Sequence, residues 1–336
     1  MNAVPLRKDE IFATTSPDQD EGIALIPVTK EDAPVTTAPK LPFGVKLPDA
    51  RSAFEALWPP LAGIGGFLAL WALAAPMVQT SLGALPGPGD VWSAFIGLID
   101  EYLAARVTAA DAEAAGYAFT GPPTFIDQIV TSLETVGAGF LLATLVAVPL
   151  GLMAGMSKRV NAAINPLVQV MRPVSPLAWL PIVTMVVSAS MVSDDPTLPK
   201  AFVISAVVVM LCSLWPTLIN TAIGTASIDK DLIAVGRVLR LGWFARLTRL
   251  VLPSSLPYIF TGMRLSLGTG WMVLIAAEML SQNPGLGKFV WDEFQNGSEK
   301  SLARIMVAVV VIGLIGFGLD RVMMAMQCFV SRNRTV

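Results

Sequence analysis

Six apolar stretches dominate the sequence, and each is long enough to cross a membrane. They run from Leu57 to Val78, Phe125 to Met156, Asn165 to Ser188, Phe202 to Gly224, Tyr258 to Leu280 and Leu302 to Val330. A hydrocarbon core of about 30 Å needs about 20 apolar residues in helical form. A helix also satisfies its own backbone polar groups, which lipid cannot do. With 54% hydrophobic and only 14% charged residues, the chain is predicted to be an all-α polytopic membrane protein with six transmembrane helices.

The remaining composition divides the chain into three parts. Residues 1–50 are rich in Pro, Thr, Asp and Lys, which predicts a disordered cytoplasmic tail rather than a cleaved secretory signal. Residues 51–124 hold the first apolar stretch, a Pro-Gly turn, a helix starting near Asp90, and an acidic, exposed insertion up to Pro123. Asp90 is placed to cap the first turn of that helix. Residues 125–336 form the core.

Small residues recur every four positions along two of the apolar stretches. In a helix this spacing places them on one face, where a neighbouring helix can approach closely in lipid. The first set is Thr135, Gly139, Ala143, Ala147, Gly151 and Gly155, and the second is Gly262, Ser266 and Gly270. The second and fifth apolar stretches are therefore predicted to be tightly packed helices.

The third apolar stretch contains Pro173, Pro176 and Pro181. Three prolines cannot all lie inside an unbroken helix, because each removes a backbone hydrogen bond and clashes with the preceding turn. Broken helices at membrane depth are tolerated where protein or a water-filled cavity covers the released backbone groups. This stretch is therefore predicted to line a pathway.

Several kinds of chemistry are excluded by the residues that are missing. The sequence has no histidine, so Ser-His and Cys-His nucleophile pairs and HExxH zinc sites are ruled out. Gly287-Lys288 is followed by Phe289 rather than Ser or Thr, so the chain has no phosphate-binding loop and binds no cofactor. Cys212 and Cys328 are expected to be core residues. A net charge of −2 gives no support for nucleic-acid binding.

The stretch from Asp229 to Pro253 is amphipathic and lies between the fourth and fifth apolar stretches. Apolar residues recur at helical spacing, Leu241-Gly242 interrupts the pattern and Pro253 is expected to end it. We predict two short helices joined at a bend on the membrane surface. The opposite face is basic, with Arg237, Arg240, Arg246 and Arg249. Together with Lys158 and Arg159 and with Arg332 and Arg334, these charges indicate that both termini and this loop are cytoplasmic.

With its continuation to Leu280, this loop resembles the cytoplasmic coupling loop of binding-protein-dependent ABC importer permeases. The resemblance depends on the ending Leu250-Val251-Leu252-Pro253, while Ala234-Val235-Gly236 stands at the family's Glu-Ala-Ala and Arg240 at its usual Gly. The helix from Thr131-Ser132-Leu133 to Pro149-Leu150-Gly151 is similar to the opening helix of the permease core. The run from Ala234 to Leu280 is most similar to the nitrate branch, a relative of the sulfonate, taurine and bicarbonate permeases.

This resemblance implies the fold and the partners of a type I ABC importer permease in a bacterial inner membrane. A cytoplasmic coupling helix would lie between the fourth and fifth transmembrane helices. The expected partners are a second copy in a homodimer, two cytoplasmic ATP-binding subunits, a substrate-binding protein outside and the lipid bilayer. ATP and Mg would be bound by the partner subunits, so the chain itself is expected not to be an enzyme.

Two groups of residues are candidates for function. Coupling to the ATP-binding subunits is expected at Asp231, Leu232, Val235, Gly236, Arg237, Leu239, Arg240, Leu241, Gly242, Trp243 and Phe244. The alternative is an amphipathic loop held only by lipid. The translocation pathway is expected at Arg172, Arg264, Trp179, Glu134 and Glu278. For the arginines the alternative is snorkelling to the headgroups, and for the two glutamates an ordinary interfacial position.

Nitrate is the substrate that the resemblance favours, and nitrite or cyanate would be carried in the same way. Bicarbonate, taurine and alkanesulfonates are alternatives within the same architecture. A channel or secondary transporter working without ATP is a different class, but it predicts paired broken helices, whereas the sequence shows one proline-rich stretch. A membrane enzyme is the third class, and the sequence holds no motif for it.

Overall fold

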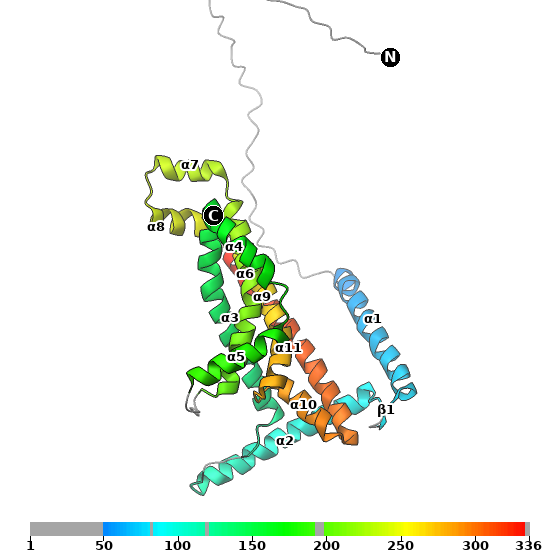
Figure 1. Ribbon diagram of the computed structural model, residues 1–336. Coiled ribbons are helices and arrows are strands. Elements are labelled where there is room, and N and C mark those ends of the chain that lie inside the picture. The colour runs from blue at the N-terminus through cyan, green and yellow to red at the C-terminus, as the bar shows by residue number, and fades with distance from the viewer. Residues whose placement is uncertain (1–49, 81–82, 118–120, 192–197, 333–336) are drawn as a thin grey trace, which may run out of the picture. The chain divides into compact units, whose positions relative to one another are not determined.

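A computed structural model of the chain describes residues 50–80, 83–117, 121–191 and 198–332. It divides into two units, one ending at Pro59 and the other running from Pro60 to Val336. In the first unit the described residues form the opening turns of α1 (Ala50–Ala74), and the predicted tail at residues 1–49 lies outside the described ranges. The second unit is built almost entirely from helices (Figure 1).

The elements that follow α1 are a single helical turn at Ala75–Met77, a two-stranded antiparallel ribbon of β1 (Gln79–Thr80) and β2 (Gly83–Ala84), and then helices. The helices are α2 (Pro88–Ala114), α3 (Phe125–Met156), α4 (Lys158–Met171), α5 (Pro176–Ser190), α6 (Lys200–Ala226), α7 (Lys230–Val238), α8 (Trp243–Arg246), α9 (Leu252–Ser281), α10 (Leu286–Asn296) and α11 (Glu299–Arg332). A π-helical turn at Leu247–Val251 joins α8 to α9.

Five helical stretches in the described ranges are long and apolar enough to cross a membrane: Leu57–Met77, Phe125–Met156, Lys200–Ala226, Trp243–Ser281 and Lys300–Val330. The pair α4 and α5 makes a sixth if it is counted as one broken span. The mostly helical, multi-pass character predicted from the apolar stretches is therefore confirmed.

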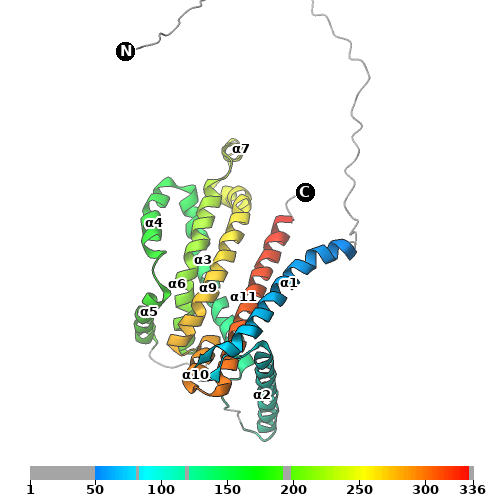
Figure 2. The ribbon, with the colours of Figure 1, turned by 90° about the vertical axis from the view of Figure 1, so that its right-hand side faces the viewer.

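Helices α3, α6 and α9 pack side by side at the centre of the second unit (Figure 2). The small residues of the two predicted faces lie at these contacts. A Cβ atom added to Gly139 of α3 would lie 2.7 Å from the carbonyl oxygen of Ala206 on α6. On α9, one added to Gly270 would lie 2.5 Å from Oγ of Ser213, again on α6. Both predicted faces are confirmed, and α6 is their shared partner.

The predicted break in the third apolar stretch is also confirmed. Helices α4 and α5 meet at a bend of 103°. Pro173 lies in the turn between them, and Pro176 is the first residue of α5, where a missing N–H costs nothing. The helical part begins at Lys158, directly after α3, and so earlier than the Asn165 expected from hydrophobicity. Figure 2 shows both helices on the flank of α6.

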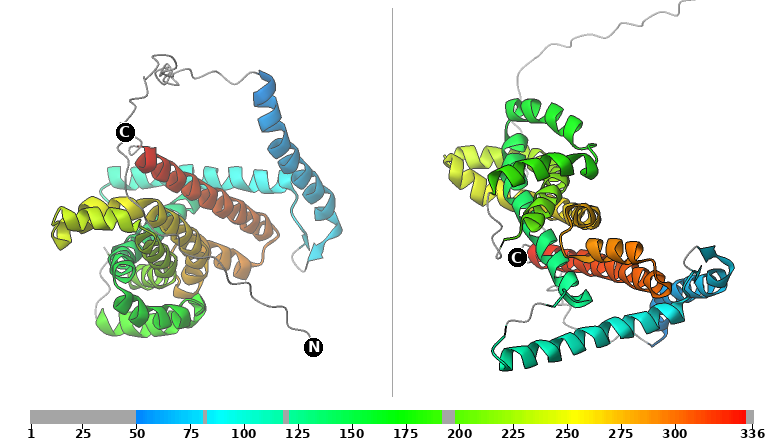
Figure 3. Two further views of the ribbon diagram at one scale, coloured as in Figure 1. Left: turned by 90° about the horizontal axis from the view of Figure 1, so that it is seen from above. Right: turned by 60° about the horizontal axis from the view of Figure 1, so that its bottom comes forward.

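At the end of the unit opposite to α7 and α8, the helices differ from the sequence prediction. Helix α2 is 27 residues long, so most of the predicted insertion is helical; Asp90 caps its first turn, accepting a 2.9 Å bond from the Gly87 N–H. It crosses this end beside the start of α11 (Figure 3). Helix α10 was not predicted from the sequence. Elsewhere in the unit, the two cysteines were expected to be core residues. Cys328 is instead exposed on α11, and Cys212 is half-buried on α6.

Candidate coupling loop and translocation site

Helices α7 and α8 form a loop that projects from one end of the second unit (Figures 1 and 3). The start of α7 is capped by Asp229, whose Oδ1 accepts a hydrogen bond of 3.0 Å from the backbone N–H of Asp231. Gly236 is buried, and a Cβ atom there would lie 2.7 Å from Cδ1 of Leu250. This contact folds α7 back onto the turn that precedes α9, so the loop has a defined shape.

Large apolar side chains on this loop point away from the rest of the unit. Trp243 is 60% exposed and Phe244 is 70% exposed. The others are Val235, Val238 and Leu239. Isolated exposed apolar side chains are normal, but five within ten residues indicate a surface that another protein or lipid covers. Leu232 and Leu241 are half-buried and support the loop from within, and the side chain of Arg237 lies outside the described part of the structure.

Arg240 occupies the bend between the two helices. Its φ of 49° lies in the left-handed region, which costs a residue with a side chain roughly 1–2 kcal/mol. The bend is closed by a 3.0 Å hydrogen bond from the Leu241 N–H to the carbonyl of Gly236. The conformation explains why the coupling-loop signature has glycine at this position, since glycine adopts a positive φ without cost.

The prediction that Pro253 ends the helical pattern of the loop is wrong. Pro253 lies in the first turn of α9, where proline is compatible with a helix, and one helical stretch runs from Trp243 to Ser281. The π-helical turn before it, with its wider i→i+5 hydrogen bonding, lets the helical path continue from α8 into α9. The loop is therefore joined to α9 without a break in the helical path.

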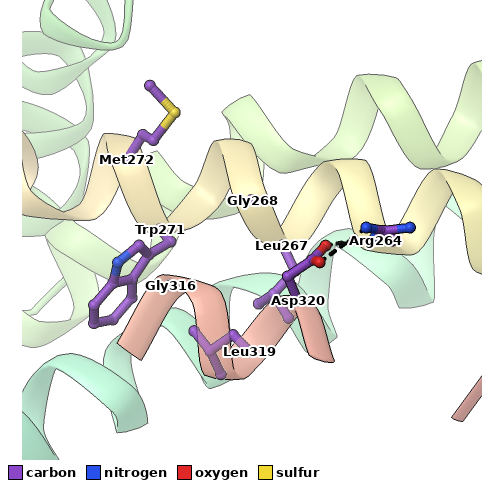
Figure 4. Close-up of a pocket in the computed structure, with 8 residues that line it drawn as sticks. All are labelled: Arg264, Leu267, Gly268, Trp271, Met272, Gly316, Leu319 and Asp320. Atoms are coloured by element: carbon purple, nitrogen blue, oxygen red, sulfur yellow. Dashed lines mark hydrogen bonds and ion pairs between the residues drawn. The ribbon is translucent and has the colours of Figure 1, made fainter. Parts of the chain in front are cut away.

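Arg264 on α9 makes an ion pair with Asp320 on α11, inside two of the apolar stretches. Nε of Arg264 lies 2.5 Å from Oδ1 of Asp320, and its second nitrogen lies 2.8 Å from Oδ2. The pair borders a cavity of about 200 Å³, shown in Figure 4. Trp271 forms part of the wall, and its indole N–H donates to the Ile312 carbonyl over 3.0 Å. Asp320 was not predicted to be a site residue, although it is an acidic residue within the sixth apolar stretch.

Arg172 lies at the other predicted position, the end of α4 beside the bend. Its side chain is exposed and makes no hydrogen bond or ion pair with any described residue. It borders an open cavity of about 550 Å³ together with Gln169, Pro173 and Ile219. Trp179 is half-buried on α5. Within one chain, Arg172 and Arg264 therefore line different cavities.

Glu278 is fully buried inside the chain rather than exposed on its surface, and its role in the pathway stays a prediction. Both carboxylate oxygens lie 2.9 Å from the Ser132 hydroxyl of α3, and one accepts a 2.9 Å bond from the Gly287 N–H. A Cβ atom on Gly285 would lie 2.2 Å from this carboxylate, so the turn into α10 is shaped around it. Glu134, by contrast, is exposed on α3.

A second buried carboxylate, Glu293 of α10, holds the same end of the unit together. It accepts a 2.7 Å hydrogen bond from Ser301 and a 3.0 Å ion pair from Arg304, both on α11. Arg304 also reaches Glu101 on α2. Buried charges are stable only when paired and hydrogen-bonded, so these contacts fix α2, α10 and α11 relative to one another.

Comparison with known proteins places this architecture in a family. Residues 147–332 match the family described as the binding-protein-dependent transport system inner membrane component. The chain belongs to this family and is an ABC importer permease subunit, a transport component rather than an enzyme. Membership implies ATP-binding subunits and a substrate-binding protein as partners.

The individual relatives show to which branch of the family the chain belongs. The chain is 34% identical over 284 residues to the bicarbonate transport system permease protein CmpB of Synechococcus elongatus, covering 84% of this chain and 92% of that protein. It is 38% identical over 194 residues to the nitrate import permease protein NrtB of the same organism, covering 58% and 66%. An inward-facing structure of the MetNI methionine ABC transporter matches 60% of this chain with a TM-score of 0.45 and 13% identity. The chain is a permease of the nitrate and bicarbonate branch.

Proposed function

We propose that this chain forms the path by which a small planar monoanion, nitrate first, enters the cell. It would work as a homodimer with two cytoplasmic ATP-binding subunits, which bind ATP and Mg, and with a binding protein outside. The identity of 38% over 194 residues to NrtB supports nitrate. Bicarbonate is the second candidate, because the match to CmpB extends over nearly the whole of that protein.

One observation supports the coupling role most directly: the exposed loop and α9 are one mechanical piece. Trp243 and Phe244 stand exposed at the start of a helical stretch that continues past Arg264 to Ser281. An ATP-binding subunit that seats on these side chains would move α9 as a rigid body. The loop and the C-terminal end of α11 lie at the same end of the unit (Figure 1), which agrees with a shared cytoplasmic side. Arg334, also used for that orientation, lies outside the described residues.

The coupling role is tested by replacing one exposed tryptophan and comparing it with another. Trp243→Ala should lower the amount of ATP-binding subunit that co-purifies with the tagged permease, because it removes a large apolar contact. Trp92→Ala is the matched control, since Trp92 is 65% exposed but lies on α2 at the opposite end. Equal retention of the ATP-binding subunit in both variants would reject docking through this face.

The substrate is tested by uptake into proteoliposomes that contain the complex and its binding protein. ATP-dependent accumulation of labelled nitrate supports the first candidate, and accumulation of labelled bicarbonate alone replaces it by the second. Taurine or an alkanesulfonate as the transported solute would reject both. Uptake that proceeds equally well without ATP would place the chain among channels or secondary transporters.

A further inference from the structure

The ion pair between Arg264 and Asp320 is placed where an ion pair is costly to keep. Both residues lie within helical stretches that are long and apolar enough to span a membrane. The side chain of Arg264 is 38% exposed and that of Asp320 is 36% exposed, so the pair is open on one side rather than sealed in the core. Ionisable groups at such depths usually face a cavity and serve an ion or a substrate.

The cavity beside the pair has the size and the lining of a site for a small anion. Its volume of about 200 Å³ is several times the roughly 30 Å³ that one water molecule occupies. Apart from the pair, the wall is apolar, with Leu267, Trp271 and Leu319. The indole N–H of Trp271 is already bonded to a carbonyl. Arg264 is therefore the group in this wall that can hold an anion.

The geometry of the pair shows what kind of anion fits. Asp320 meets the guanidinium with two oxygens in the fork arrangement of a bidentate pair, at 2.5 and 2.8 Å. A carboxylate is planar and offers two oxygens along one edge. A planar anion with three oxygens, such as nitrate or bicarbonate, offers the same edge, whereas a halide does not.

We propose that Arg264 is an anion-binding residue of this cavity and that the Asp320 carboxylate is its internal competitor. In the empty site Asp320 occupies the guanidinium edge, and a planar three-oxygen monoanion displaces it during passage. Because Asp320 is more than a third exposed, the displaced carboxylate can turn toward the open side of the pair and is not sealed in the core. The Asp320 carboxylate also competes with the bound anion for the guanidinium, and this competition speeds release of the anion from Arg264. This inference rests on the proposed function and names the subsite that serves it.

The test compares KM and kcat for ATP-driven nitrate uptake in proteoliposomes containing the whole complex. Asp320→Asn keeps the shape of the side chain but removes its charge, so the KM for nitrate should fall about tenfold, the effect of losing one charge-assisted competitor. The kcat should fall as well, because release becomes slower. Arg264→Gln should raise the KM for nitrate. Arg264→Lys should also raise it and should discriminate less between nitrate and chloride, because an ammonium group is a point charge without the paired N–H donors of a guanidinium.

Asp320→Glu controls for folding, because it retains a competing carboxylate and should keep a KM close to that of the wild type. A purely structural ion pair predicts instead that Asp320→Asn lowers thermal stability and leaves the KM unchanged; that result would overturn the proposal. If the wild-type complex transports bicarbonate and not nitrate, the substrate choice fails while the same KM comparison, made with bicarbonate, still tests the subsite. Transport of only a tetrahedral sulfonate would reject a planar anion as the occupant of the subsite.

Discussion

The close contact between α3 and α6 makes Gly139→Ala the sharpest test of the packing. The new Cβ atom would lie 2.7 Å from the Ala206 carbonyl oxygen and 2.7 Å from Cγ1 of Val209. A carbonyl inside a helix cannot move alone, so the two helices must separate. Overpacking of this kind costs about 3 kcal/mol at the upper end, and alanine regains about 1 kcal/mol through its higher helix propensity. The free energy of unfolding should therefore fall by about 2 kcal/mol.

Gly137→Ala is the matched control on the same helix. Gly137 is half-buried, and a Cβ atom added to it meets nothing within 4 Å. This variant should be as stable as the wild type or gain up to about 1 kcal/mol from helix propensity.

Thermal unfolding of the purified protein in detergent provides the measurement for both glycine variants. For a chain of 336 residues, about 2 kcal/mol corresponds to a lowering of the Tm by roughly 3 °C. If both variants gave the same Tm, the small-residue face would not be what brings α3 and α6 together.

Three further changes follow from single contacts, each measured by the Tm of the purified protein. Arg240→Gly should stabilise the loop by about 1 kcal/mol, because glycine adopts the φ of 49° without strain; a lower Tm would show that the arginine side chain matters more than the bend. Glu278→Ala should cost at least about 3 kcal/mol, since two buried donors lose their acceptor, whereas Glu278→Gln should cost less because it keeps an oxygen there. Arg304→Met should cost about 3 kcal/mol by leaving the buried Glu293 uncompensated, while Glu101→Ala, at the exposed side of the same arginine, should cost under about 1 kcal/mol.

The transmembrane helices could be predicted because their signals are local. An apolar stretch of sufficient length sets a spanning helix on its own, and α3 begins and ends at the predicted Phe125 and Met156. The four-residue spacing of small residues also identified the packed faces, since spacing along a helix determines which residues share a side. The partner of those faces, α6, could not be read from the spacing. It is selected by which helices lie next to each other.

The errors occurred where a local signal was overridden by its surroundings. Pro253 indicated a helix end, but a proline in the first turn of a helix removes no hydrogen bond, so α9 continues through it. Glu278 looked interfacial because it stands near the end of an apolar stretch. Its burial depends on Ser132, which is 146 positions away in the chain.

The Arg264–Asp320 pair shows what the sequence did contain and how the fold changes its meaning. Charged residues inside apolar stretches are rare and usually find one another, so a basic residue in the fifth stretch and an acidic one in the sixth could have been paired on charge alone. The fold adds that the two helices are not equivalent. Helix α9 continues from the exposed loop, whereas α11 reaches the same end separately (Figure 1). A force applied at Trp243 therefore acts on one partner of the ion pair and not directly on the other. Under the proposed coupling role, the pair would join a helix that the loop moves to one that it does not, so an anion site there would open once in each transport cycle.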